Sequence, residues 1–143
     1  MNTGDLTMRC TIVAALLLAF ANTPARAQTQ TYEQKTAKLR DLVSAIDGGA
    51  NEAAEVPLSG WIQMAQNELR AIKTKLTPAE KSRASLDAYA QALTKYLEFQ
   101  NDLYKFFRDP PPDGSNDAAK ITEVEKDAHK AVVHADSLFA AGN

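Results

Sequence analysis

The chain has 143 residues, of which 16 are basic and 18 acidic, and its only cysteine is Cys10. The net charge of −2 is small and of mixed sign along the chain, which argues against nucleic acid or an anionic membrane surface as the main partner. A single cysteine excludes an internal disulfide, and the length suits one small domain.

Residues 1–27 are predicted to be a secretory signal peptide that is cleaved. A basic residue, Arg9, precedes a short apolar run from Ile12 to Ala21, and Ala25-Arg26-Ala27 matches a small-x-small cleavage site. The run is too short to act as a stable membrane anchor. We therefore expect one helical-bundle domain at residues 28–143, without a membrane anchor, in the bacterial periplasm or secreted beyond it.

Two helices are predicted in the first half of that domain, at residues 30–47 and 58–76. Gly48-Gly49 ends the first, because glycine readily takes the left-handed conformation found at helix ends, and Pro57 or Ser59 opens the second. Apolar residues recur with a helical period in both segments. These residues are Tyr32, Leu39, Leu42, Val43 and Ile46 in the first helix and Leu58, Trp61, Ile62, Ala65, Leu69, Ile72 and Leu76 in the second.

The third predicted helix, at residues 78–107, is the longest and holds most of the aromatic side chains. Thr77 and Glu80 have the spacing of a capping box, and Pro78 fits the first helical position. No glycine or proline follows until Pro110, so we expect an unbroken helix about 45 Å long. The capping box favours a tight antiparallel hairpin with the preceding helix over one helix kinked at Pro78.

The fourth predicted helix covers residues 117–140 and follows a stiff spacer formed by Pro110, Pro111 and Pro112. It ends near Gly142. Four amphipathic segments with mostly short connections predict an all-α, antiparallel four-helix bundle. Because the third helix overhangs the shorter ones by several turns, the alternative is a bundle that dimerises through this helix.

The aromatic end of the third helix admits two interpretations. The apolar surface at this end is wide. It fits a helix that is buried between two neighbours, and it also fits an exposed patch that binds a partner or an apolar ligand. Aromatic residues are enriched in interface hot spots. The candidate residues for binding a protein partner, or for self-association, are Trp61, Tyr96, Phe99, Tyr104, Phe106 and Phe107.

Few residues suggest chemistry. The loops bring no histidine to Ser59 or Ser115, and the chain has no glycine-rich phosphate cradle, so we expect neither an enzyme nor a cofactor. The best candidates for metal ligands are Glu125, His129 and Asp136, which fall on one face of the fourth helix. A solvated helix face explains these three residues better than a metal site does, so no metal is expected.

One short segment resembles a known family. Leu76-Thr77-Pro78-Ala79-Glu80 is similar to the Leu-Thr-x-x-Gln motif of the Spy and CpxP periplasmic stress chaperones, with Glu80 in place of the glutamine. The similarity covers these five residues, in a single copy, and the capping box accounts for them as local structure. Those chaperones are small, exported, all-helical proteins, so the resemblance implies a periplasmic chaperone.

The sequence thus predicts an exported, non-enzymatic helical bundle that acts as a protein-interaction or structural module. Two alternatives stay open: a carrier bundle for a small ligand or a metal, and a periplasmic stress chaperone. Nucleic acid is not an expected partner, because acidic residues interleave the basic ones.

Overall fold

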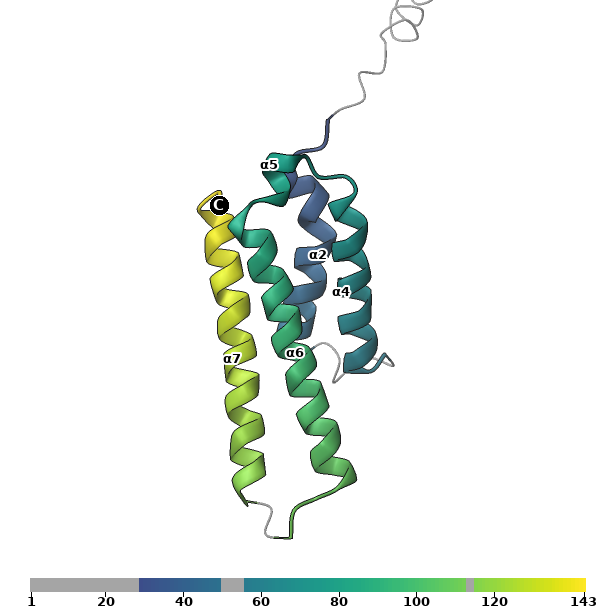
Figure 1. Cartoon of the computed structure of the whole chain (residues 1–143), viewed down its shortest axis with the longest axis vertical. Helices are drawn as coiled ribbons and strands as arrows, with labels where there is room; N and C mark the ends of the chain where they lie inside the picture. Colours follow the sequence, from purple (N-terminus) through teal and green to yellow (C-terminus); the bar gives the residue numbers. More distant parts are fainter. Residues whose placement is uncertain (1–28, 50–55, 113–114) are drawn as a thin grey trace, which may run out of the picture. The chain divides into compact units, whose positions relative to one another are not determined.

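The structure, a computed structural model, describes residues 29–49, 56–112 and 115–143. All secondary structure in these ranges is helical, which confirms the predicted all-α class (Figure 1). The chain divides into two compact units, Met1–Gln30 and Thr31–Asn143, and the description below concerns the second. The predicted signal peptide, residues 1–27, lies wholly outside the described residues. Within them, none of the helices combines the length and the apolar character that crossing a membrane requires.

Helix α2 (Tyr32–Asp47) begins and ends with local signals. Thr31 forms a capping box with Gln34, in which each residue's side chain bonds the other's backbone N–H. This cap lies one to two residues after the predicted start at residue 30. After Asp47, Gly49 has a φ of 72°, as expected for a helix stop made by glycine.

Helix α4 (Leu58–Lys73) is shorter than the predicted segment 58–76. Residues 74–76 form a turn, in which the Thr74 hydroxyl donates to the carbonyl of Ala71 over 2.7 Å. Such local side-chain bonds offer the backbone an alternative to continuing the helix. Leu76 nevertheless stays buried, so its predicted place in the core is confirmed although it lies outside the helix.

The prediction of one unbroken helix over residues 78–107 is wrong. A four-residue helix, α5 (Pro78–Lys81), is followed by a break and then by α6 (Ala84–Arg108). The capping box of Thr77 and Glu80 is present, but Arg83 has an extended backbone with ψ of 132°. This backbone places the Arg83 guanidinium 4.3 Å from the ring centroid of Tyr32, so a tertiary cation–π contact accompanies the break.

Helix α7 (Ser115–Ala140) is the last element, and it begins two residues before the predicted start at residue 117. The helices pack in pairs: α2 on α4, α4 on α6 and α6 on α7, with additional contacts from α2 to α6 and α7. Of these pairs, α6 and α7 have the most extensive contact, and Figure 1 shows them continuing side by side beyond the ends of α2 and α4.

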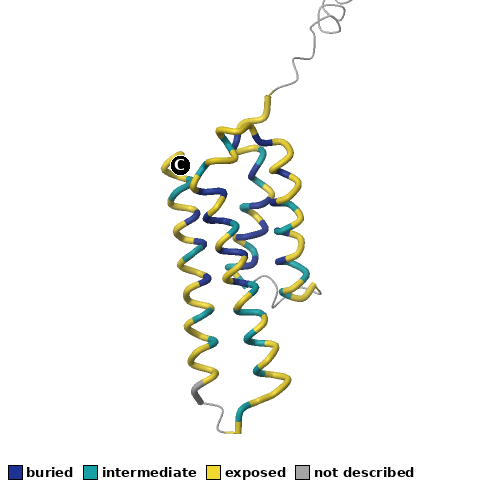
Figure 2. The backbone as a smooth tube through the Cα atoms, viewed as in Figure 1, coloured by how far each residue is buried: buried dark blue, intermediate teal, exposed yellow. Residues whose placement is uncertain are grey.

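The hydrophobic core occupies only part of the two long helices. Buried residues of α6 end at Tyr96, and those of α7 begin at Ala128. Figure 2 shows the change along both helices, from buried positions beside α2 and α4 to half-buried and exposed positions beyond them. We call the uncovered part, residues 100–108 of α6 and 115–127 of α7, the arm.

An ion pair fastens α5 to α2. Lys35 Nζ lies 2.9 Å from Glu80 Oε2, and both side chains are largely shielded from solvent. Hydrogen bonds from Lys35 and from the backbone N–H of Thr77 hold the pKa of Glu80 below its usual value.

From the ion pair between Lys35 and Glu80 we expect a loss of stability in acid. A lowered pKa in the folded state contributes stability that is present above the ordinary pKa of glutamate and is lost as the pH falls through the folded pKa. We expect Glu80→Gln to lower the melting temperature at neutral pH and to flatten its decline below about pH 4.5. Thermal melting across this pH range checks the prediction, and an unchanged acid profile in the variant would contradict it.

Candidate functional site

The arm exposes the same face of α6 that the core buries further along the helix. Leu86, Leu93, Gln100 and Phe107 follow one another at intervals of seven residues, and therefore lie on nearly one line along the helix. Leu86 and Leu93 are each 1% exposed, Gln100 is half-buried and Phe107 is 74% exposed. The core-facing line thus continues into solvent past the point where α2 and α4 stop covering it.

A second line along α6 shows the same change. Ala90 and Leu97 pack against the core, and Tyr104, seven residues further on, is 62% exposed. On α7, Ala135 and Ala128 are fully buried, whereas Ile121 is half-buried. We define the arm patch as the apolar residues of this uncovered region: Leu103, Tyr104, Phe106, Phe107, Ile121 and Val124.

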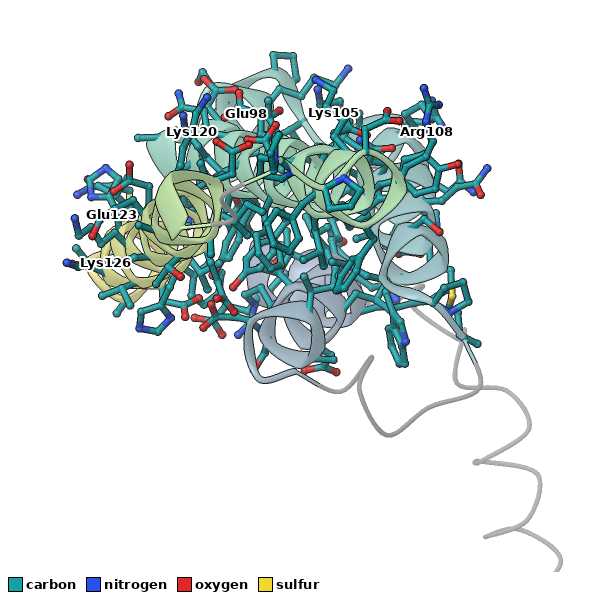
Figure 3. All side chains as sticks on the ribbon, turned by 90° about the horizontal axis from the view of Figure 1, so that it is seen from below. Glu98, Lys105, Arg108, Lys120, Glu123 and Lys126 are labelled. Carbon is teal, nitrogen blue, oxygen red and sulfur yellow. The ribbon has the colours of Figure 1, made fainter. Side chains whose placement is uncertain are left out.

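Three basic residues of the arm lie away from α2. In Figure 3, the labelled side chains of Lys105, Arg108 and Lys120 lie on the side of α6 and α7 that faces away from α2. Arg108 pairs with the neighbouring Asp109 over 3.2 Å at the end of α6. These three basic side chains thus lie away from α2, whereas the exposed carboxylate of Glu125 lines a small pocket together with Ile46 and Asp47 of α2.

The structure separates the six predicted partner-binding residues into two groups. Tyr96 is 4% exposed and belongs to the core, while Trp61 and Phe99 are half-buried and pack against that core. Phe106 is half-buried on the arm, where its ring meets that of Phe107 edge-on at 5.7 Å. Of the predicted set, Tyr104, Phe106 and Phe107 therefore lie on the arm, and Trp61, Tyr96 and Phe99 do not.

A surface pocket of about 360 Å³ lies where α6 and α7 approach each other on the arm. Phe106 and Ile121 contribute its apolar walls. Its other lining residues carry charges of both signs: Asp102, Lys105, Asp109, Asp117 and Lys120. A small-molecule site is usually lined mainly by apolar groups. The lining of this pocket holds more charged residues than such a site usually has.

A hydrogen-bonded cluster that the sequence did not predict joins three helices at the level where α2 ends. Tyr96 Oη donates to Asp47 Oδ1 over 2.5 Å, and His129 Nδ1 lies 2.9 Å from the same oxygen. Asp47 is mostly shielded, and His129 is more than half exposed. The three side chains connect α2, α6 and α7, and no local motif signals them because they come from distant parts of the chain.

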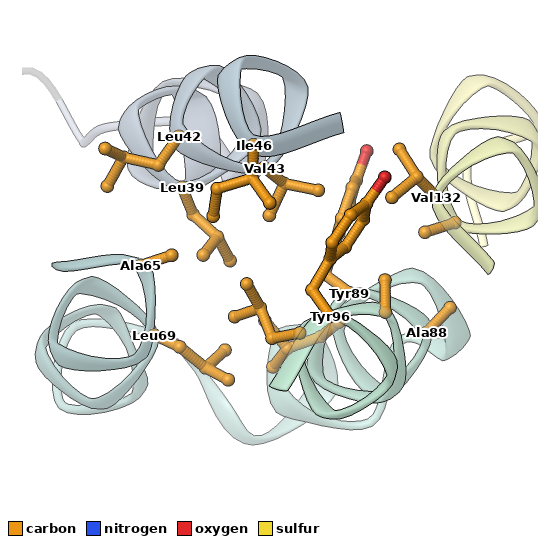
Figure 4. Packing of buried hydrophobic residues seen from close by; sticks show 14 of the residues in the cluster. Leu39, Leu42, Val43, Ile46, Ala65, Leu69, Ala88, Tyr89, Tyr96 and Val132 are labelled. Atoms are coloured by element: carbon orange, nitrogen blue, oxygen red, sulfur yellow. The ribbon is translucent and has the colours of Figure 1, made fainter. Parts of the chain in front are cut away.

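A second tyrosine makes an equivalent bond one heptad earlier on α6. Tyr89 Oη donates to Asp136 Oδ1 of α7 over 2.6 Å. Figure 4 shows both phenol oxygens pointing between α2 and α7. Burial, together with the neighbouring carboxylates, raises the pKa of Tyr89 and of Tyr96 far above the ordinary value. These phenols therefore act as hydrogen-bond donors that hold the helices in register.

The metal candidates Glu125, His129 and Asp136 each have a different environment. His129 contacts Asp47, Asp136 accepts from Tyr89, and Glu125 lines a small pocket beside Tyr96. Across the ranges that the structure describes, no group of three or more histidine, cysteine, aspartate or glutamate side chains could hold a metal ion. Two of the three candidates thus have structural partners on other helices.

Comparisons with known proteins add no relative to this picture. The chain matches no protein-family model, no curated protein and no solved structure.

Proposed function

We propose that this chain is an exported, non-enzymatic protein-interaction module of the bacterial periplasm. In this proposal, α2, α4, the first half of α6 and the second half of α7 form an antiparallel four-helix bundle. The arm extends from that bundle and binds a protein partner through the arm patch. The observation that carries the proposal is the exposure of Phe107, 74%, at a helix position whose equivalents in the bundle are 1% exposed.

The bundle proposal is supported by the way the helices contact one another. Each of the four has a neighbour on two sides, in the cyclic order α2, α4, α6, α7. All four contribute buried residues, among them Leu39, Ile62, Leu93 and Val132. Short connections between neighbouring helices favour antiparallel pairs. The bundle provides a rigid base that positions the arm.

Energetics favour a partner on the arm. Burying a large apolar side chain is favourable by about 1.5–3 kcal/mol. Phe107 and Tyr104 are mostly exposed, so most of this favourable free energy becomes available only when a partner covers them. Aromatic residues surrounded by polar groups are typical of binding hot spots. The charged lining of the neighbouring pocket supplies polar contacts of both signs that could orient a partner.

Two of the other functions considered from the sequence have less support. A small-ligand carrier would need a mainly apolar cavity, and five of the seven residues that line the pocket of the arm are charged. The resemblance to the stress chaperones falls on Thr77 and Glu80, which form the capping box of α5. An exposed aromatic patch would also suit a chaperone, so this function remains an alternative form of the same binding activity.

The experiment is native mass spectrometry on the protein released from the periplasm of its bacterial host. We expect an intact mass for residues 28–143 and an additional species that contains a bound protein. In the variant Tyr104→Asp/Phe107→Asp, the bound species should fall at least tenfold, because a buried charge without a partner is strongly unfavourable.

The matched control is Asn101→Asp, an exposed position of the same helix on the side opposite Leu103. It adds a charge at the same level of the arm and should leave the complex intact. Asn101→Asp should change the free energy of unfolding by no more than about 0.5 kcal/mol, and the double variant by about 1–2 kcal/mol, because two aspartates are unfavourable near the C-terminal end of α6. A complex that survives in the double variant, or a wild-type protein that never carries another chain, overturns the proposal.

A further inference from the structure

We infer that the arm patch is covered by the arm of a second copy of this chain, packed in the inverted direction. The inference rests on the proposed function, since it names the partner of the same surface. It predicts a symmetric dimer. In this dimer each arm lies beyond the ends of α2 and α4 of the other copy, in the same layer as these two helices.

The layer of helices that the arm patch lacks would consist of two helices. In the bundle, the inward face of α6 and α7 is covered by one layer made of α2 and α4. The arm is a direct continuation of that face, at the same heptad positions, and it lacks the covering layer. A second arm is itself a layer of two helices, of the same length as the surface that it would cover.

Steric exclusion selects the direction of packing. If two copies met face to face with their arms parallel, the α2 and α4 layers of both would need the same space. Inverting one copy removes the overlap, because each arm then occupies the level at which the other copy has no α2 or α4. Association through one self-complementary patch with two-fold symmetry is the commonest form of homodimer.

The polarity of the patch suits a copy of itself. Its middle consists of Leu103, Phe107, Ile121 and Val124, with Gln100 as the polar member. Lys105, Arg108 and Lys120 lie on the side of the arm away from α2, so two arms can meet without bringing these three charges together (Figure 3). A polar residue at one heptad position is a common means of fixing register in coiled coils.

The size of the patch predicts a weak dimer. The arm contains thirteen residues of α7 and nine of α6, which at about 1.5 Å each are about 20 and 14 Å long, and each helix is about 10 Å wide. The planar footprint is then about 340 Å² per copy, or about 680 Å² for both copies, which is below the size of stable interfaces and in the range of weak, transient ones. We therefore expect a dimer that dissociates on dilution.

The test uses single cysteines in the full chain carrying Cys10→Ser, which has no other thiol. Leu103 lies near the middle of the arm, so Leu103→Cys should form a disulfide-linked dimer under mild oxidation. Asn101→Cys, on the opposite side of α6, should stay monomeric. Analytical ultracentrifugation of the parent chain should show a mass that doubles as the concentration rises.

A mixing experiment determines the direction. Gln100 and Phe107 are about equally far from the middle of the arm, so in the inverted dimer each faces the other. We expect Gln100→Cys mixed with Phe107→Cys to cross-link, with a yield at least fivefold above that of either variant alone. Efficient cross-linking of each variant with itself would show a parallel pair and overturn the inverted arrangement.

Failure of the inference can be told apart from failure of the proposed function. A chain that stays monomeric at all concentrations and forms no Leu103→Cys disulfide overturns the dimer, and a Tyr104→Asp variant with wild-type dimerisation does so too. If periplasmic mass spectrometry then shows a different protein on the arm, the proposed function stands without the dimer. If it shows no bound protein either, both are wrong.

Discussion

The substitution Leu93→Ala is expected to lower the free energy of unfolding by about 2–5 kcal/mol, whereas Phe107→Ala should change it by less than about 1 kcal/mol. The two residues occupy the same heptad position of α6, fourteen residues apart. Leu93 is 1% exposed and Phe107 is 74% exposed. Removing the larger side chain therefore has the smaller effect, because only Leu93 leaves a cavity.

The free energy of unfolding that Leu93→Ala is expected to remove is large relative to the stability of the whole domain. A domain of this size is stable by about 5–15 kcal/mol, so Leu93→Ala removes a substantial fraction. The measurement is urea unfolding followed by circular dichroism, at a protein concentration low enough to keep the chain monomeric. At high concentration Phe107→Ala should become destabilising, because a dimer that buries Phe107 stabilises the folded state.

The opposite result would be informative about the arm. If Phe107→Ala costs as much as Leu93→Ala in dilute solution, the arm is covered within one chain, and both the arm patch and its proposed partner are wrong. Asn101→Ala is the control for changes in helix propensity at an exposed position of the same helix.

Much of the fold could be predicted because its signals are local. The heptad spacing of apolar residues located four helical segments, and Gly49 marks a helix stop with the conformation expected of it. The break at Ser82 and Arg83 was missed, because neither residue is a strong helix breaker. The Ser82 hydroxyl donates to the carbonyl of Ala79, and Arg83 stacks on Tyr32, a contact between residues 51 positions apart that periodicity does not reveal.

The candidate site was predicted in part for the same reason. The sequence predicts aromatic residues near the end of the long helix, and the helix lengths predict that this helix overhangs its neighbours. Whether each aromatic lies in the core depends on where α2 and α4 end relative to α6, which is a tertiary property. Tyr96 and Phe107 are both aromatic residues within the apolar pattern of the helix, yet Tyr96 is 4% exposed and Phe107 is 74% exposed.

The polar contacts of the core could not be predicted at all. Asp47, Tyr96 and His129 come from three helices, and their pairing depends on the register of α2 and α7 against α6. Sequence reasoning assigned His129 and Asp136 to a solvated surface or a metal site. Both residues are exposed in the structure, as on a solvated helix face, and each also contacts another helix: Asp136 accepts from Tyr89, and His129 lies beside Asp47.

These tyrosine contacts predict a marked loss of stability in alkaline solution. Burial and the adjacent carboxylates raise the pKa of Tyr89 and Tyr96 in the folded state, whereas in the unfolded chain a phenol ionises near pH 10. A raised pKa contributes stability that is fully present below the unfolded value and is lost as the pH rises towards the folded value. Helix content and melting temperature should therefore fall above about pH 10, with tyrosinate absorbance from these two residues appearing as the chain unfolds.

The variant Tyr89→Phe/Tyr96→Phe separates this effect from the general consequences of high pH. It removes both ionising groups, so the decline of the melting temperature above about pH 10 should become shallower. At neutral pH it should be less stable by about 1–3 kcal/mol per site, because Asp136 and Asp47 each lose a donor. Leu39→Ala serves as the control: it destabilises the core without removing a phenol, and should keep the alkaline slope of the wild type. Full tyrosinate absorbance at unchanged helix content would mean that the phenols ionise in the folded protein, and that the contacts to Asp47 and Asp136 do not hold the helices together.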